Sequence, residues 1–295
     1  DLPLRVLAKD CYPEYVVRIN SYSKPGYLID ILQVLEGLPE LELLLQSPLG
    51  KLFKLPVRHC SLSGQLLHQL LCRQLQTQHL EETWFVFGGY PIRFSLAEFA
   101  NVTGLNCSPY PTVDVLRNAT SHTEGNSPYW YKLIGGTPGG TTVPEIVNWL
   151  KSDPTIPPWR KFRLALIVIV EGILLCRTQP VKPSVEVVEM VRNVHFFLNY
   201  PWGRHAFTRT LRMIKVGHQI TSIATLVTKL NQFSLAVHGF PLAIQLHAFK
   251  CIPLLLRHLP HAAEVFSFID QKISALPKLK SFHTSNILQV EYDPL

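Results

Sequence analysis

The residues best suited to chemistry in this sequence are a run of unneutralised cations in its C-terminal third. From Met190 to Ala263 the chain has no aspartate or glutamate, yet it holds seven of the twelve histidines and eight lysines or arginines. These eight are Arg192, Arg204, Arg209, Arg212, Lys215, Lys229, Lys250 and Arg257. The whole chain is formally +7, so this window carries +8 and the other residues sum to −1. Such an excess attracts polyanions, most commonly nucleic acid, although a basic surface without a function would show the same pattern.

A helix over residues 204–216 would collect the polar members of this window on one side. At 100° per residue, six of them fall within an arc of about 140°: Arg204, His205, Thr208, Arg209, Arg212 and Lys215. The adjoining face is mostly apolar, so the helix would pack that side inward and present its guanidinium groups outward. Arginine can bind guanine O6 and N7, or clamp phosphates. We therefore expect these residues to read the major groove of double-stranded DNA, against the alternative of a solvated polar face.

Two further basic clusters are candidates for phosphate contacts. Arg160, Lys161 and Arg163 alternate with the aromatic residues Trp159 and Phe162, and Lys51, Lys54 and Arg58 lie in a second acid-free stretch. If all three clusters line one groove, roughly 6–10 phosphate contacts follow, and binding should depend strongly on salt concentration.

Motifs of the common enzyme classes are absent. The sequence contains no nucleophile elbow, no phosphate-binding loop, no dinucleotide-binding glycine pattern and no H-E-x-x-H zinc motif. His258 and His261 are closely spaced, but Pro260 and the lack of a nearby cysteine argue against zinc. The six cysteines are scattered, as in an intracellular protein with reduced thiols. We expect a protein with no enzymatic activity, metal or cofactor.

The composition predicts a folded domain with a substantial core. Hydrophobic residues make up 47% of the chain and charged residues only 17%. The most apolar run, Leu164–Leu175, is interrupted by Glu171 and is too short for a membrane span, which needs about 20 residues. It is better explained as a buried helix. The chain begins at Asp1 without an initiator methionine, which favours an excised domain.

The clearest local signal is a β-hairpin over about 83–94. Aromatic and β-branched residues flank Gly88-Gly89, which supplies the positive φ angles of a tight turn, and Pro91 places the second strand at an edge. Ser95 and Glu98 then form a capping box for a short helix that stops at Gly104.

Elsewhere the pattern predicts helices, and the fold class is mainly α, a multi-helix globular domain with one small hairpin. A leucine-rich helix over 28–45 should break near Gly37, and a second capping box opens at Thr142. The later helices are expected at roughly 159–176, 184–199, 204–216, 221–237, 241–258 and 261–275, with Gly217 and Gly239 as helix stops. Residues 108–143 should be a long, lid-like loop anchored by Tyr129–Tyr131. The proline-rich connector 153–158 separates an N-terminal part, 1–152, from a basic all-helical part, 153–295, unless the chain is one continuous domain.

Four segments resemble a plant domain family of unknown function that occurs in transposon-encoded proteins, some with a SUMO-type protease domain. They are Ser47–Phe53, Trp84–Cys107, Tyr200–Arg204 and His238–Phe249. Within that family, the chain is most similar to the VANC anti-silencing proteins of VANDAL (Mutator-like) DNA transposons.

The resemblance implies a nuclear protein that binds short motifs in the non-coding DNA of its own transposon, causes loss of DNA methylation and derepresses the element. It supplies no DNA-contact residues, so the candidates above depend on charge and periodicity. A function from another class is a protein-interaction module that recruits chromatin or SUMO-pathway factors. Binding to transposon DNA distinguishes the two.

Overall fold

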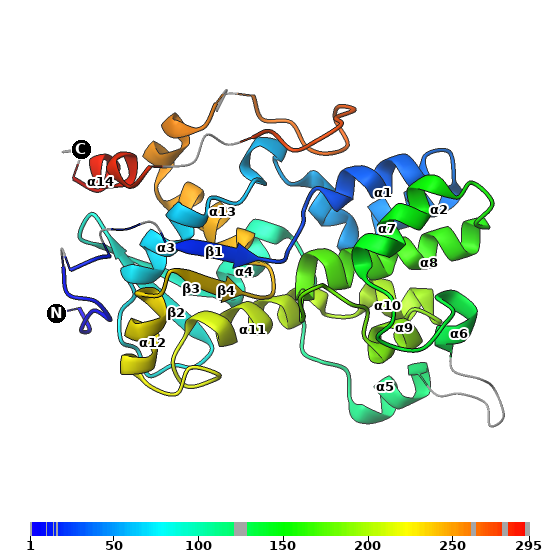
Figure 1. The fold of residues 1–295 in the computed structure, drawn as a ribbon, viewed down its shortest axis with the longest axis horizontal. Coiled ribbons are helices and arrows are strands. Elements are labelled where there is room, and N and C mark those ends of the chain that lie inside the picture. Colours follow the sequence, from blue (N-terminus) through cyan, green and yellow to red (C-terminus); the bar gives the residue numbers. More distant parts are fainter. Residues whose placement is uncertain are drawn as a thin grey trace.

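A computed structural model describes residues 2–9, 11–13, 15, 17–120, 129–260, 264–278 and 283–292. It is mainly helical with a small antiparallel hairpin, which confirms the expected fold class (Figure 1). The helices before the connector are α1 (Tyr27–Leu35), α2 (Pro39–Gln46), the 3-10 helices η1 (Pro48–Lys54) and η2 (Val57–His59), α3 (Gly64–Cys72), α4 (Leu96–Thr103), α5 (Val113–Thr120), α6 (Tyr129–Leu133) and α7 (Val143–Ser152). Those after it are α8 (Pro158–Ile169), the π-helix η3 (Val170–Leu175), α9 (Val185–Met190), α10 (Val194–Asn199), α11 (Trp202–Ile214), α12 (Ile223–Leu230), α13 (Leu242–Cys251), the 3-10 helix η4 (Pro253–His258) and α14 (Thr284–Tyr292).

The hairpin forms as its local sequence predicts. Strands β2 (Glu82–Phe87) and β3 (Tyr90–Ser95) pair with Phe87 opposite Tyr90, and both intervening glycines have positive φ. Ser95 and Glu98 complete the capping box of α4, and Gly104 ends that helix in the left-handed conformation. The second capping box, at Thr142, opens α7.

A second sheet was not predicted. Strand β1 (Arg18–Ser21) pairs in parallel with β4 (Ser234–Val237), which lies more than 200 positions later in the chain. The helix expected over 221–237 therefore ends at Leu230, and Gly239 follows a strand rather than a helix. The expected helix over 261–275 is also wrong, because 264–275 contain none. Pairing with β1 satisfies backbone hydrogen-bonding groups of 234–237. Local periodicity could not predict this pairing, because β1 is distant in the sequence.

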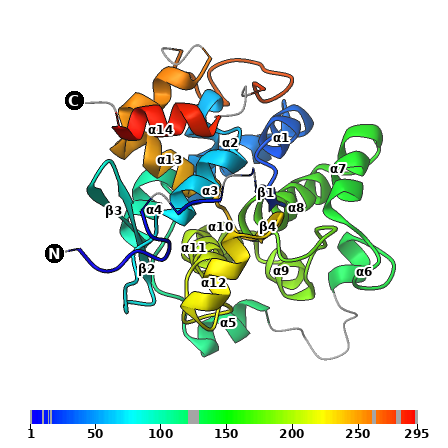
Figure 2. The same ribbon diagram turned by 60° about the vertical axis from the view of Figure 1, so that its left-hand side comes forward.

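The apolar run 164–175 is buried in the core, as expected. Every residue from Leu164 to Leu175 is buried in α8 and η3. Helix α8 packs against α1, α2 and α7, while η3 packs against α11 (Figures 1 and 2). One cluster of buried apolar residues includes members from both sides of the connector 153–158. The packing of η3 against α11 couples the core directly to the basic helix.

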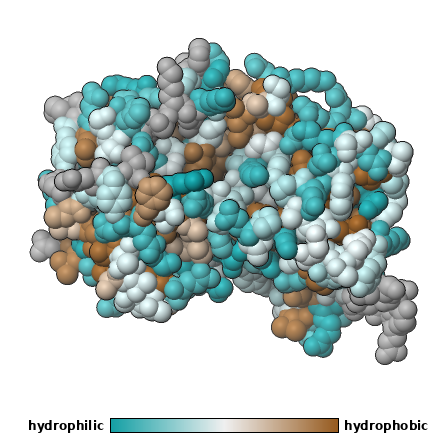
Figure 3. Space-filling model, viewed as in Figure 1, coloured by the Kyte–Doolittle hydropathy of each residue, from teal (hydrophilic) through white to brown (hydrophobic). Residues whose placement is uncertain are grey.

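The expected loop 108–143 contains two short helices. Tyr129 and Trp130 of α6 are buried, as an anchor should be. Helix α5 buries none of its residues and projects at the bottom of Figure 1. Hydrophobic atoms lie exposed there in Figure 3, since the exposed fractions of Val113 and Val115 are 70% and 50%. Residues 121–128 of the expected lid lie outside the described part of the chain.

Candidate nucleic-acid interface

Helix α11 carries most of the predicted basic face. It buries an apolar side that includes Phe207, Leu211 and Ile214, and it leaves Arg204, His205, Thr208, Arg209 and Arg212 partly or fully exposed. The buried hydroxyl of Thr210 helps to hold the helix in place, because it accepts a hydrogen bond from the Phe240 N–H at 2.8 Å. Gly239, which precedes Phe240, leaves room for this hydroxyl. A Cβ at position 239 would collide with the Thr210 Oγ1, so only glycine fits there.

Four of these residues line a pocket with groups from distant parts of the chain. The pocket has a volume of about 410 Å³. Its described lining consists of Tyr110, Pro111, Leu116, Arg177, Tyr200, His205, Thr208, Arg209 and Arg212. Tyr110 and Pro111 precede α5, Leu116 belongs to α5, and Tyr200 follows α10. Arg177 follows Cys176, which ends η3 in the left-handed conformation. The fold thus brings three guanidinium groups to one concave site.

The three arginines crowd one another electrostatically. Burial and the positive charges of Arg177 and Arg212 lower the pKa of Arg209. The Arg209 Nη2 lies 3.3 Å from the Arg177 carbonyl oxygen, to which it donates, and 3.2 Å from the His238 Nδ1. Burial, followed by the charges of the three arginines, lowers the pKa of His205 to about 4. His205 is therefore neutral at pH 7, and pKa shifts of this kind often mark a functional site.

Carboxylates offset this charge only in part. Arg177 lies 3.9 Å from the buried Glu171 and 3.7 Å from Glu186. Within the described residues, neither Arg209 nor Arg212 forms an ion pair with a carboxylate. The pocket therefore has positive charge available for an anion.

Aromatic side chains also line the pocket. Tyr110 is 46% exposed, and the Tyr110 and Tyr200 rings lie 6.2 Å apart. Arg204 stands 6.0 Å from the Tyr110 ring, and its Nε donates to the Ser108 carbonyl oxygen at 2.7 Å. Arg204 thus fastens the segment before α5 to α11. This segment therefore covers part of the polar face of α11.

Lys215 does not belong to this face. The expected helix over 204–216 ends at Ile214, and Lys215 is extended and only 3% exposed. Its Nζ donates to the carbonyl and hydroxyl oxygens of Thr77, at 3.0 and 2.7 Å. Its charge is used inside the fold, so we remove Lys215 from the candidate interface.

The two other predicted clusters lie elsewhere. Arg160 donates to the Leu133 carbonyl oxygen at the end of α6, and the Arg163 guanidinium lies 5.9 Å from the Trp159 ring. Lys161 lines a separate hollow. Arg58 pairs with Glu264, while Lys51 and Lys54 are exposed on η1. Among the described residues that line the arginine pocket, none comes from these clusters.

Sequence reasoning missed Arg177, Tyr110 and Tyr200. Arg177 lies outside the acid-free window, and Tyr110 lies in the segment that was interpreted as a loop. Tyr200 opens one of the four segments that carry the family resemblance, and this was the one available signal. No spacing rule joins these three residues, because they meet only when η3 and the segment before α5 pack against α11.

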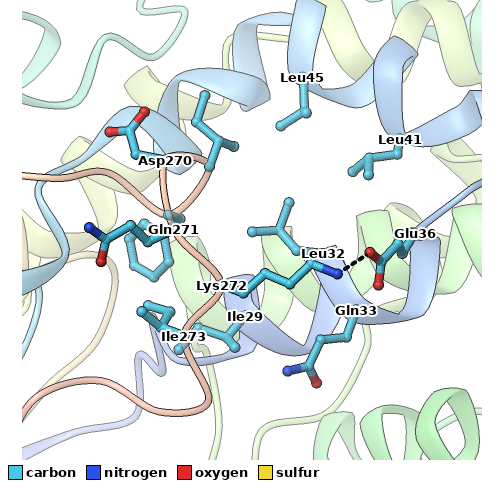
Figure 4. Close-up of a pocket in the computed structure, with 12 residues that line it drawn as sticks. Ile29, Leu32, Gln33, Glu36, Leu41, Leu45, Asp270, Gln271, Lys272 and Ile273 are labelled. Atoms are coloured by element: carbon cyan, nitrogen blue, oxygen red, sulfur yellow. Dashed lines mark hydrogen bonds and ion pairs between the residues drawn. The ribbon is translucent and has the colours of Figure 1, made fainter.

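A second pocket shares none of its described lining residues with the arginine pocket. A pocket of about 340 Å³ between α1, α2 and 268–273 has an apolar floor that includes Leu32 and Leu41 (Figure 4). At its mouth, the Lys272 Nζ lies 2.5 Å from a Glu36 carboxylate oxygen.

No group of three or more potential metal ligands occurs in the described part of the chain. The helices described there include none that is long and apolar enough to cross a membrane.

One family model matches part of this chain. Residues 71–213 match the family model of a plant domain of unknown function, DUF1985. All described residues that line the arginine pocket lie inside the matched region, whereas Lys51, Lys54, Arg58 and Lys215 lie outside it. No curated protein and no solved structure matches the chain.

Proposed function

We propose that this chain is a sequence-specific double-stranded DNA-binding domain. The observation that supports this function is the convergence of Arg177, Arg209 and Arg212 on one pocket with incomplete carboxylate compensation. Guanidinium groups in such a fork geometry bind phosphate oxygens in bidentate fashion. The acid-free window around α11 adds a long-range field that attracts a polyanion.

The resemblance to VANC proteins supplies the biological part of the proposal. In this view the domain belongs to an anti-silencing factor of a VANDAL transposon, acts in the nucleus and targets the non-coding DNA of its own element. Binding there would promote loss of DNA methylation. Selection of bound duplexes from a random pool, at a stated salt concentration, tests sequence specificity directly and would yield the recognised motif.

The salt dependence of binding tests the role of the arginines. Each phosphate contact contributes about 0.9 to the slope of log Kobs against log salt concentration. The double variant Arg209→Gln/Arg212→Gln should therefore lower the magnitude of the slope by about 2 and weaken binding to the selected duplex. Arg212→Gln alone, at an exposed position, should lower it by about 1.

A control with the same loss of charge is Lys229→Gln/Lys272→Gln. Lys229 lies inside the acid-free window but not among the described residues of the pocket, and Lys272 lies on the segment 268–273. The control should change the slope much less. Equal effects of the two double variants would show that only net charge matters, and an unchanged slope in both would remove the pocket from the proposal.

A second candidate is a module that recruits chromatin proteins. The exposed apolar residues Val113 and Val115 of α5 favour it, since exposed apolar groups of this kind often mark contact sites. The variant Val113→Ser/Val115→Ser should then abolish co-purification of a nuclear protein while DNA binding is unchanged. Loss of neither activity would exclude α5 as the contact.

A further inference from the structure

The arginine pocket is concave, whereas the paired bases of a DNA duplex are stacked inside the double helix. Its volume of about 410 Å³ falls in the range of roughly 300–1,000 Å³ that is typical of small-molecule sites. The segment that contains Tyr110 and Pro111 forms one wall, and α11 forms another. Phosphates on the outside of a duplex can touch the rim, whereas the interior suits a group that leaves the helical stack.

The two walls offer two complementary chemistries. Arg177, Arg209 and Arg212 supply positive charge, and the Thr208 side chain forms a hydrogen bond with Tyr110. Tyr110, a residue that is 46% exposed, lines the same pocket together with the apolar side chains of Pro111 and Leu116. A phosphate suits the first wall, and the flat face of a base suits the second, because bases stack on aromatic rings whatever their sequence.

We infer that this pocket takes one unpaired nucleotide of DNA, with its phosphate on Arg177, Arg209 and Arg212 and its base against Tyr110. The inference rests on the proposed function and specifies its substrate. Extrusion of a base from a duplex costs least where the base is already unpaired. The protein should therefore prefer DNA that contains an unpaired nucleotide over a perfect duplex.

Two probes of otherwise identical sequence measure this preference. One is a 20-base-pair duplex, and the other carries a single unpaired thymidine at its centre. Fluorescence anisotropy at fixed salt concentration should show about tenfold tighter binding of the bulged probe, within the range that stacking of one base supports. Tyr110→Ala should abolish this preference, so that the variant binds the two probes with equal affinity. Tyr110→Phe keeps the ring and should retain most of it.

The outcomes separate the inference from the proposed function. If wild-type protein binds both probes equally, or if the preference survives Tyr110→Ala, the inference fails while duplex binding stands. If neither probe is bound, both fail. Binding of a phosphotyrosine peptide without binding of either DNA would also overturn both and assign the pocket to a phosphoprotein.

Discussion

Protonation of His205 should make the stability of this domain fall with pH below neutrality. The folded state holds the pKa of His205 at about 4, compared with an ordinary value of 6.5, because of burial and the charges of Arg177, Arg209 and Arg212. In the unfolded chain the imidazole takes up its proton first, near pH 6.5. The contribution of neutral His205 to stability is therefore fully present above pH 6.5 and is lost as the pH falls toward 4.

The size of this effect follows from the two pKa values. Between pH 7 and pH 5 the differential protonation of this one histidine amounts to about 2 kcal/mol. The glutamine in His205→Gln does not titrate in this range. The free energy of unfolding of this variant should therefore fall by about 2 kcal/mol less than that of wild type between pH 7 and pH 5. Urea denaturation of wild type and variant at pH 7, 6 and 5 measures the difference in the free energy of unfolding.

Two results would refute the reasoning. The gap between wild type and His205→Gln could stay constant within about 0.5 kcal/mol from pH 7 to pH 5, which would mean that His205 protonates equally well in the folded state. Alternatively, removal of all three charges in Arg177→Gln/Arg209→Gln/Arg212→Gln could leave the pH dependence unaltered. Loss of the neighbouring charges should raise the pKa of His205 part of the way toward 6.5 and flatten the profile, while burial still lowers it.

Two further variants test the packing around the pocket and the core by urea denaturation. Gly203→Ala would place a Cβ 2.6 Å from the Cys107 Sγ, so it should force the segment before α5 away from α11 and cost about 1–3 kcal/mol. Gly26→Ala meets only one atom, at 3.9 Å, and should change little, so similar losses in both would contradict the argument. Arg73→Ala leaves the buried Glu291 without its partner at 2.5 Å and should cost about 3 kcal/mol or more. Lys151→Ala breaks an exposed pair and should cost at most about 1 kcal/mol, and an equally small loss for Arg73→Ala would show that Glu291 is readily hydrated.

Local features of the fold were predictable because their causes lie within a few residues. Gly88 and Gly89 adopt the positive φ that a two-residue hairpin turn requires, and Ser95 and Glu98 cap α4 through side chains three positions apart. The run Leu164–Leu175 is buried because all of its side chains except that of Glu171 are apolar. Residues 234–237 were predicted to be helical but form strand β4. The cause of this strand is its pairing with β1, which lies far away in the sequence.

The same distinction between local and tertiary causes applies to the candidate site. The sequence by itself determined that α11 has an apolar side and a basic side without acids, because helical periodicity and charge are read directly from residue order. Only the tertiary structure decided that Arg177 and Tyr110 join this face, that Lys215 turns inward to Thr77 and that the face becomes a pocket. The reason is physical. A positive field is the sum of charges in space, and the packing of η3 and the segment before α5 against α11 sets the distances between those charges.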